Sequence, residues 1–228
     1  MTAMTKTDAL LKFDIESELM WEPRLNATQI AVAVADGAVS LHGVVDTYAQ
    51  KWAAEDAAKR VTGVRSIVEH LAVEVLPHHT RTDAELAVAI ARSLEWDVLI
   101  PKTITAAVHE GVVTLHGQVT WNFQRTSAER SIARLAGIVS VVNEITLSPE
   151  VSVGDVKEKI ETALRRQAAA DGEAIHVGTS GNLVTLTGHA ASWGAIRDAR
   201  NAAWAVPGVT QVVDQLSIAS PAPRPPGS

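Results

Sequence analysis

The hydrophobic residues of this chain follow a fixed succession of periods that predicts two helices and three strands. The succession opens with apolar residues spaced four apart within residues 8–21: Leu11, Ile15 and Leu19. That spacing predicts an amphipathic helix. Two stretches that alternate apolar and polar residues then flank an Asp36-Gly37 pair, which is typical of a β-hairpin. An alanine-rich helical pattern over residues 46–60 and a third alternating stretch from Ile67 complete the order helix, strand, strand, helix, strand.

The same succession occurs three times, and each copy carries two glycines that stand 20 positions apart. The glycine pairs are Gly43 and Gly63, Gly117 and Gly137, and Gly188 and Gly208, offset by 74 and then 71 residues. Equal internal spacing in three copies indicates a tandem array. We therefore predict an α+β protein of three small α-β-β-α-β domains, followed by a disordered tail. Their predicted bounds are 5–75 for unit 1, 80–148 for unit 2, 152–219 for unit 3, and 220–228 for the Pro-rich tail.

Composition narrows the class of protein. Hydrophobic residues make up 46% of the 228 and charged residues 20%, which is typical of a globular chain. The chain has no cysteine, so disulfides, thiolate metal sites and cysteine nucleophiles are excluded. Its net charge is −6 and no unit is basic, whereas nucleic-acid binding needs a cluster of Lys and Arg against phosphates. We expect no nucleic-acid partner.

The chain shows neither a secretory signal nor a membrane-spanning segment. No apolar h-region follows Met1, and no run of 18 apolar residues occurs anywhere. These features favour a cytoplasmic location.

Each unit combines the pattern V-x-L-x-G with a later G-[VI]-x-x-[VI]. The first pattern appears as Val39-Ser-Leu41-His-Gly43, Val113-Thr-Leu115-His-Gly117 and Val184-Thr-Leu186-Thr-Gly188. Asn143 and Asp214 lie near the start of the last strands of units 2 and 3, whereas unit 1 has Glu69 there. This combination resembles the BON domain, a family named for bacterial osmotically inducible and nodulation proteins.

The resemblance implies a fold and a class of function. It implies two helices packed against a three-stranded sheet in each unit. It also implies a non-enzymatic module that binds phospholipid or a membrane surface in osmotic-stress proteins, many of which are periplasmic. The family has no catalytic motif to transfer, so the resemblance assigns only a structural role, to the six glycines.

The residues themselves indicate no catalytic, cofactor or metal site. No nucleophile elbow, phosphate loop or dinucleotide motif is present. His42 and His116 occupy equivalent places, and Thr187 replaces them in unit 3, which favours an exposed polar position. We expect no enzymatic activity, no cofactor and no metal.

Tryptophan is the unusual residue type, with six copies against two Phe and one Tyr. Four lie at helix ends and are candidate contacts for a lipid surface or a protein partner: Trp21, Trp96, Trp121 and Trp193. An indole suits that role because it joins an apolar body to a polar N–H. The alternative is packing between units or against helix ends.

Three valines at one place in the last strands are candidates for contact between units, within the chain or in an oligomer: Val68, Val142 and Val213. With both helices on one face of each sheet, these valines would lie on the open face, where an apolar residue marks an interface. The alternative is the β-propensity of valine on an exposed strand.

Two functions remain open at this point. The first is a module that binds phospholipid or a membrane surface, with lipid binding that is either weak or confined to unit 3. Its basic residues there are Lys157, Lys159, Arg165 and Arg166. The second is a scaffold whose packed units bind a small ligand, an ion or a protein partner, or associate with themselves.

Overall fold

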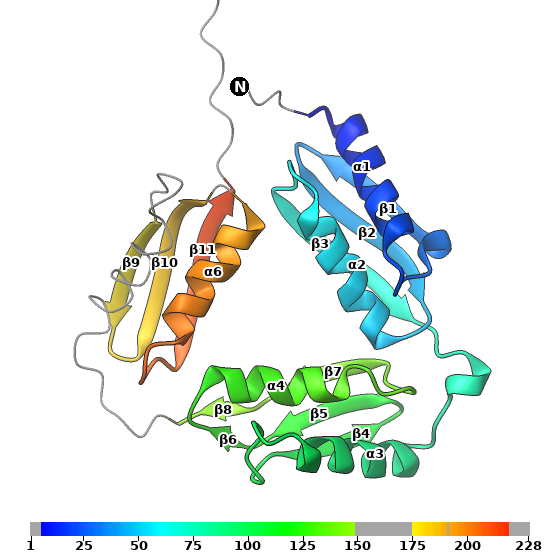
Figure 1. The fold of residues 1–228 in the computed structure, drawn as a ribbon, viewed down its shortest axis with the longest axis vertical. Coiled ribbons are helices and arrows are strands. Elements are labelled where there is room, and N and C mark those ends of the chain that lie inside the picture. The colour runs from blue at the N-terminus through cyan, green and yellow to red at the C-terminus, as the bar shows by residue number, and fades with distance from the viewer. Residues whose placement is uncertain (1–5, 149–174, 191, 219–228) are drawn as a thin grey trace, which may run out of the picture.

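The computed structural model describes residues 6–148, 175–190 and 192–218 (Figure 1). Unit 1 follows the predicted order, with a short 3-10 turn before its hairpin. Its elements are α1 (Asp8–Trp21), η1 (Ala27–Gln29), β1 (Ile30–Ala35), β2 (Ala38–Val45), α2 (Tyr48–Arg60) and β3 (Ser66–Val73).

Unit 2 repeats this order after the turn η2 (Pro77–His79). Its elements are α3 (Asp83–Trp96), β4 (Thr105–His109), β5 (Val112–His116), β6 (Gln118–Val119), α4 (Asn122–Ile132), β7 (Ser140–Asn143) and β8 (Thr146–Leu147). The last strand, predicted as one stretch, is divided into β7 and β8.

Unit 3 is described from its hairpin onward, as β9 (Ile175–Ser180), β10 (Leu183–Ala190), α6 (Trp193–Trp204) and β11 (Gln211–Ile218). Its predicted first helix, with Lys157, Lys159, Arg165 and Arg166, and the tail 220–228 lie outside the described residues.

Each unit builds its sheet in the same register. The hairpin strands pair antiparallel, and the last strand pairs parallel to the second, joined to it through the second helix. The parallel partners are Ala38 with Ser66, Val112 with Ser140, and Leu183 with Gln211, each 28 positions apart. The spacing resumes beyond the break in unit 2, where Gln118 pairs with Thr146. The crossover therefore has one length in all three units.

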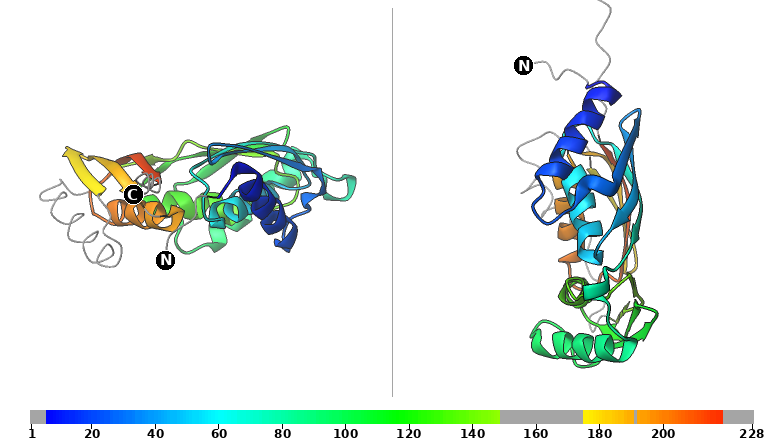
Figure 2. Two further views of the ribbon diagram at one scale, coloured as in Figure 1. Left: turned by 90° about the horizontal axis from the view of Figure 1, so that it is seen from above. Right: turned by 90° about the vertical axis from the view of Figure 1, so that its right-hand side faces the viewer.

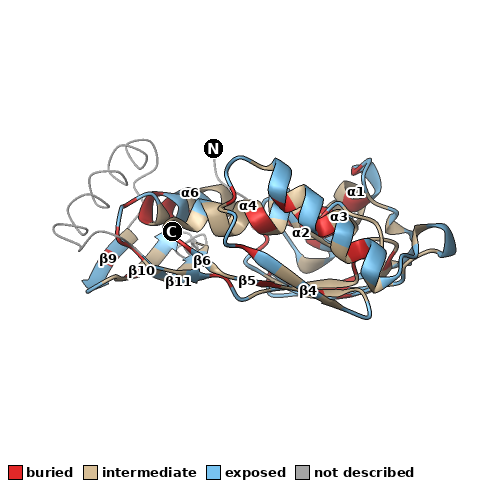
Figure 3. Ribbon diagram, turned by 90° about the horizontal axis from the view of Figure 1, so that it is seen from below, coloured by how far each residue is buried: buried red, intermediate tan, exposed pale blue. Residues whose placement is uncertain are grey.

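The core of unit 1 lies between its two helices and one face of its sheet. Leu11, Ile15 and Leu19 of α1 are buried, as the periodicity predicts. Ala54 and Ala57 of α2 are fully buried, and their small side chains let the helix lie close to the strands. Figure 3 shows the helices on one side and the strands on the other in all three units.

The six repeated glycines adopt a positive φ, a backbone conformation that glycine reaches at little steric cost. At Gly137, with φ of 96°, a Cβ would lie 3.1 Å from the Cβ of Arg81. At Gly43 a Cβ would overlap the carbonyl oxygen of Gln29. These positions therefore combine backbone conformation with close approach.

A carboxylate at the start of the first helix holds the hairpin turn. The carboxylate of Asp8 accepts hydrogen bonds from the N–H groups of Asp36 at 2.8 Å and Gly37 at 3.0 Å. Asp83 makes the equivalent bonds in unit 2, and they lower the pKa of its carboxyl. In both units these hydrogen bonds hold the start of the first helix against the hairpin turn.

The three units lie around a common centre (Figure 1). The second helices α2, α4 and α6 and the last strands face the centre, whereas α1 and α3 lie at the periphery. Figure 2 shows that the three sheets occupy one broad side of the molecule and the helices the other. No helix within the described residues has the length and apolar character needed to cross a bilayer.

The units do not meet through their open sheet faces, as one form of the prediction for Val68, Val142 and Val213 required. Val68 is 48% exposed and Val142 43% exposed, and Val213 is half-buried. The reason is that all three open faces point to the same side of the molecule (Figures 2 and 3). Contact through these faces between separate copies of the chain stays a prediction.

Candidate functional site

Trp21 and Trp96 occupy equivalent positions at the last residue of α1 and α3. They are 84% and 83% exposed, although an indole ring is large and apolar. Each has exposed apolar neighbours in sequence, Met20 beside Trp21, and Val98 and Leu99 beyond Trp96. We call the two groups the α1-end patch (Met20, Trp21) and the α3-end patch (Trp96, Val98, Leu99). Clustered exposed apolar residues mark a contact surface.

Ion pairs fix the helix end that carries the α1-end patch. The next residue, Glu22, is buried and accepts hydrogen bonds from Arg24 Nε at 2.7 Å and from Arg60 Nη2 at 2.9 Å. These bonds lower the pKa of the Glu22 carboxyl to about 2. Arg60 also donates to Glu18 at 2.8 Å, so α2 holds the end of α1 in place.

Hydroxyl groups connect the equivalent helices in unit 2. The Oγ atoms of Ser93 on α3 and Ser131 on α4 lie 2.8 Å apart, and each side chain also contacts the carbonyl of the other residue. Both exposed tryptophans therefore stand on helices that are held to the body of their unit. The two patches therefore lie at the ends of helices that are fixed to the neighbouring helix of the same unit.

Trp121 is placed differently from the two exposed tryptophans. It is half-buried at the N-cap of α4, and its ring centre lies 6.4 Å from that of Phe123. The side chain of Gln124 accepts a hydrogen bond from the Trp121 backbone N–H at 3.1 Å. Trp121 therefore packs at the start of α4, which fits the alternative that these tryptophans pack against helix ends.

Trp193 makes contact between units 3 and 1, at what we call the 3–1 junction. Its Nε1–H donates a hydrogen bond to the carbonyl of Val64 at 3.0 Å, and its ring packs against the core of unit 1. The ammonium of Lys59 lies 5.9 Å from the ring centre. This indole is used inside the molecule, in contact with another unit of the same chain.

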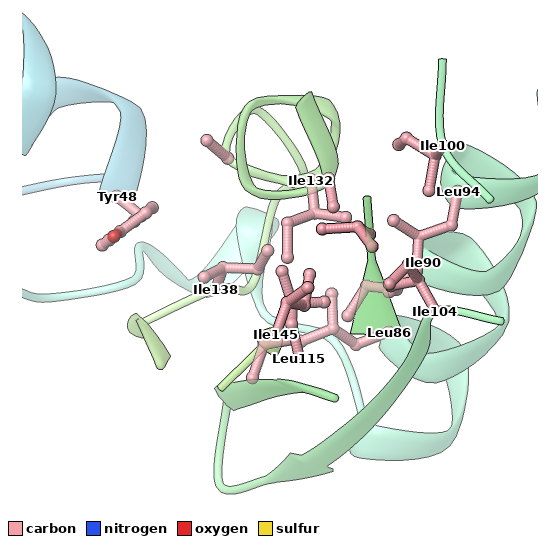
Figure 4. Packing of buried hydrophobic residues seen from close by; sticks show 14 residues of the cluster. Tyr48, Leu86, Ile90, Leu94, Ile100, Ile104, Leu115, Ile132, Ile138 and Ile145 are labelled. Carbon is pink, nitrogen blue, oxygen red and sulfur yellow. The ribbon is translucent and has the colours of Figure 1, made fainter. Parts of the chain in front are cut away.

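Tyr48, which was not selected from the sequence, makes the corresponding contact at the 1–2 junction. It is 8% exposed and belongs to the core cluster of unit 2, with Trp52 packed beside it. Figure 4 shows Tyr48 reaching from unit 1 to the side of this cluster where Ile138 lies. Burial raises the pKa of the Tyr48 hydroxyl.

The repeat offsets place Tyr48 and Trp193 at one position, the first residue of the second helix. The residues on the side that each ring approaches, Ile138 and Val64, are equivalent as well (Figure 4). The signal that could have found Tyr48 is its alignment with Trp193, because both are aromatic at a helix end.

No group of three or more His, Asp or Glu side chains suited to a metal ion occurs within the described residues. The site therefore consists of two exposed aromatic patches and the junctions between units.

The geometry defines a tandem array of small α+β modules, and comparison with known proteins identifies their kind. The model of the BON domain matches residues 7–75, 82–149 and 152–220. The chain belongs to the BON domain family.

One curated relative and two solved structures are similar to this chain. Osmotically-inducible protein Y of Escherichia coli (strain K12) is 27% identical over 146 residues, which are 60% of this chain and 71% of the relative. CdsD, a structural protein of the type III secretion system of Chlamydia trachomatis, is 15% identical with a TM-score of 0.25 and 90% of each chain covered. The periplasmic domain of PrgH from S. typhimurium is 13% identical with a TM-score of 0.22, covering 84% of this chain and 94% of that one.

Proposed function

We propose that this protein is a non-enzymatic, stress-associated binding protein whose first helices contact a phospholipid surface. Family membership and the similarity to an osmotically-inducible protein support the class. The observation that carries the proposal is the exposure of Trp21 and Trp96 at equivalent helix ends. Tryptophan is enriched at the boundary between lipid and water because its ring is apolar and its N–H polar.

Electrostatics determine which lipid this surface suits. The chain carries a net charge of −6, and basic residues near an anionic membrane contribute only about 1 kcal/mol each. Attraction to anionic lipid is therefore weak, and insertion of apolar side chains supplies the binding energy. Binding to neutral phospholipid should persist as the salt concentration rises, because it does not depend on screened charges.

Co-sedimentation with phosphatidylcholine vesicles tests this proposal. The double variant Trp21→Ala/Trp96→Ala should bind about tenfold more weakly, a loss of about 1.4 kcal/mol. Val68→Thr/Val142→Thr is the matched control, since it removes exposed apolar groups from the sheet side and should leave binding unchanged. An equal loss of vesicle affinity in both double variants would show that the helix ends are not the lipid contact. Binding that disappears as the salt concentration rises would contradict an apolar contact.

A second candidate is a scaffold whose packed units bind a small ligand, and a cavity lined by residues of units 2 and 3 favours it. The predicted cytoplasmic location stays a prediction, which subcellular fractionation would test.

A further inference from the structure

The junction between units 2 and 3, the 2–3 junction, differs from the other two at the position that closes them. Where unit 1 has Tyr48 and unit 3 has Trp193, the second helix of unit 2 begins with Asn122. A cavity of about 280 Å³ lies beside Asn122, between α4 and β7 on one side and α6 and β11 on the other. The cavity occupies the junction that has no aromatic side chain at this position.

The polar wall of this cavity carries balanced charge. Two guanidinium groups line it, Arg125 and Arg200, and two carboxylates, Glu129 and Asp214. Arg200 Nη1 lies 3.8 Å from Asp214 Oδ2, which is a loose ion pair, and the Arg200 side chain is 54% exposed. A ligand can therefore meet charges of both signs from one position.

Existing hydrogen bonds fix two of the polar side chains in this wall. The amide of Asn143 donates to Glu129 Oε2 and to the backbone carbonyl of Arg125, both at 3.2 Å. Asp214 Oδ1 accepts from the Leu216 N–H at 3.0 Å. The carboxylates are thus oriented by the protein itself, and such preorganisation lowers the entropy cost of binding.

The remaining wall is apolar and includes an indole. Trp204 and Val212 line the cavity and also pack against the core of unit 3. Aromatic rings attract cations, quaternary ammonium groups in particular. An indole beside two carboxylates therefore suits a cationic, weakly hydrated group.

We propose that the 2–3 junction binds a small zwitterion with a carboxylate or phosphate at one end and an ammonium group at the other. The two arginines would attract a simple anion, but the two carboxylates would repel it. A simple cation would be attracted by the carboxylates and repelled by the arginines. A zwitterion satisfies both pairs. The cavity volume of about 280 Å³ suits a compact solute or a lipid headgroup.

The proposal is independent of lipid contact through Trp21 and Trp96. Glycine betaine and glycerophosphocholine are the probes, because they present the same charge pattern as a free solute and as a headgroup. Choline and acetate, each bearing half of that pattern, are the comparison probes. The measurement is the NMR shift of the Trp204 indole N–H during titration, with the signal assigned by Trp204→Phe.

We expect saturable shifts with at least one zwitterion, and affinity about tenfold above that for choline or acetate. The ratio between the two zwitterions identifies the source of the ligand. Equal affinity for choline or for acetate, or no saturable shift with either zwitterion, would overturn the proposal.

Variants of the cavity sharpen the test. Asn122→Tyr gives unit 2 the residue that closes the 1–2 junction, and it should abolish zwitterion binding in a folded chain. Asp214→Asn should weaken glycine betaine binding and strengthen acetate binding, because one carboxylate is neutralised. Glu69→Gln, at the equivalent position of unit 1, should change neither affinity. Unaltered glycine betaine binding in folded Asn122→Tyr would place the ligand elsewhere and overturn the assignment.

Discussion

The 1–2 and 3–1 junctions are closed by aromatic side chains, whereas the 2–3 junction is not. Tyr48 and Trp193 enter the neighbouring core from the first residue of a second helix, but Asn122 at the same place borders a cavity. The backbone order and the crossover length of 28 positions are the same in all three units. At this one side-chain position, an aromatic ring that enters the neighbouring core is therefore replaced by an amide that borders a cavity with four charged side chains in its wall.

The largest expected effect comes from opening the 1–2 junction. Tyr48→Ala should lower the free energy of unfolding by about 3 kcal/mol, because a buried aromatic side chain leaves a cavity. Urea denaturation followed by circular dichroism measures the change. Phe13→Ala removes an aromatic ring that is 66% exposed and should cost less than about 0.5 kcal/mol. Similar losses in the two variants would show that Tyr48 does not close the junction.

A smaller effect is expected from altering one hydrogen bond at the 3–1 junction. Trp193→Phe keeps a six-membered aromatic ring but removes the donor to the Val64 carbonyl, at a cost of about 1 kcal/mol. Thermal denaturation measures this change. Trp96→Phe, at a ring that is 83% exposed, serves as its control and should leave the midpoint unchanged. If both variants melt at the wild-type temperature, the bond contributes nothing.

The smallest effect concerns alkaline pH. Burial raises the pKa of Tyr48 above its ordinary value near 10, so the folded state favours the neutral hydroxyl. Stability from this group is full below the unfolded pKa and falls as pH rises through the folded pKa. Tyr48 is the only tyrosine, so ultraviolet absorbance of tyrosinate reports its ionisation directly. An ionisation midpoint at or below that of the urea-unfolded chain would contradict burial of the hydroxyl.

Local patterns predicted most of the fold within one unit. The spacing of Leu11, Ile15 and Leu19 predicted α1, and the paired glycines predicted the three repeats. These features depend on residues near one another in sequence, so a single sequence contains them. The break between β7 and β8 was not predicted, because no Pro or Gly interrupts residues 140–147.

The arrangement of the units could not be predicted in the same way. Valine on the open sheet faces favours β-structure and also marks interfaces, so Val68 and Val142 are compatible with either role. Contact through Tyr48 depends on the relative orientation of two folded units, which no local period encodes. Of the four candidate tryptophans, Trp21 and Trp96 are exposed, whereas Trp121 and Trp193 are half-buried.

The beginning of α1 and the end of β11 lie at the same corner of the molecule. Asp8 binds the hairpin turn at Asp36, and Asp36 and Ile218 line one further cavity between units 1 and 3. Because the three units close a ring, their packing does not dictate where the covalent chain starts. A circular permutant that begins at unit 2, joins residue 218 to residue 8 by a short polar linker and ends after β3 would make the same three junctions. The covalent connections keep the three units close together, and the side chains at the junctions determine how the units are arranged.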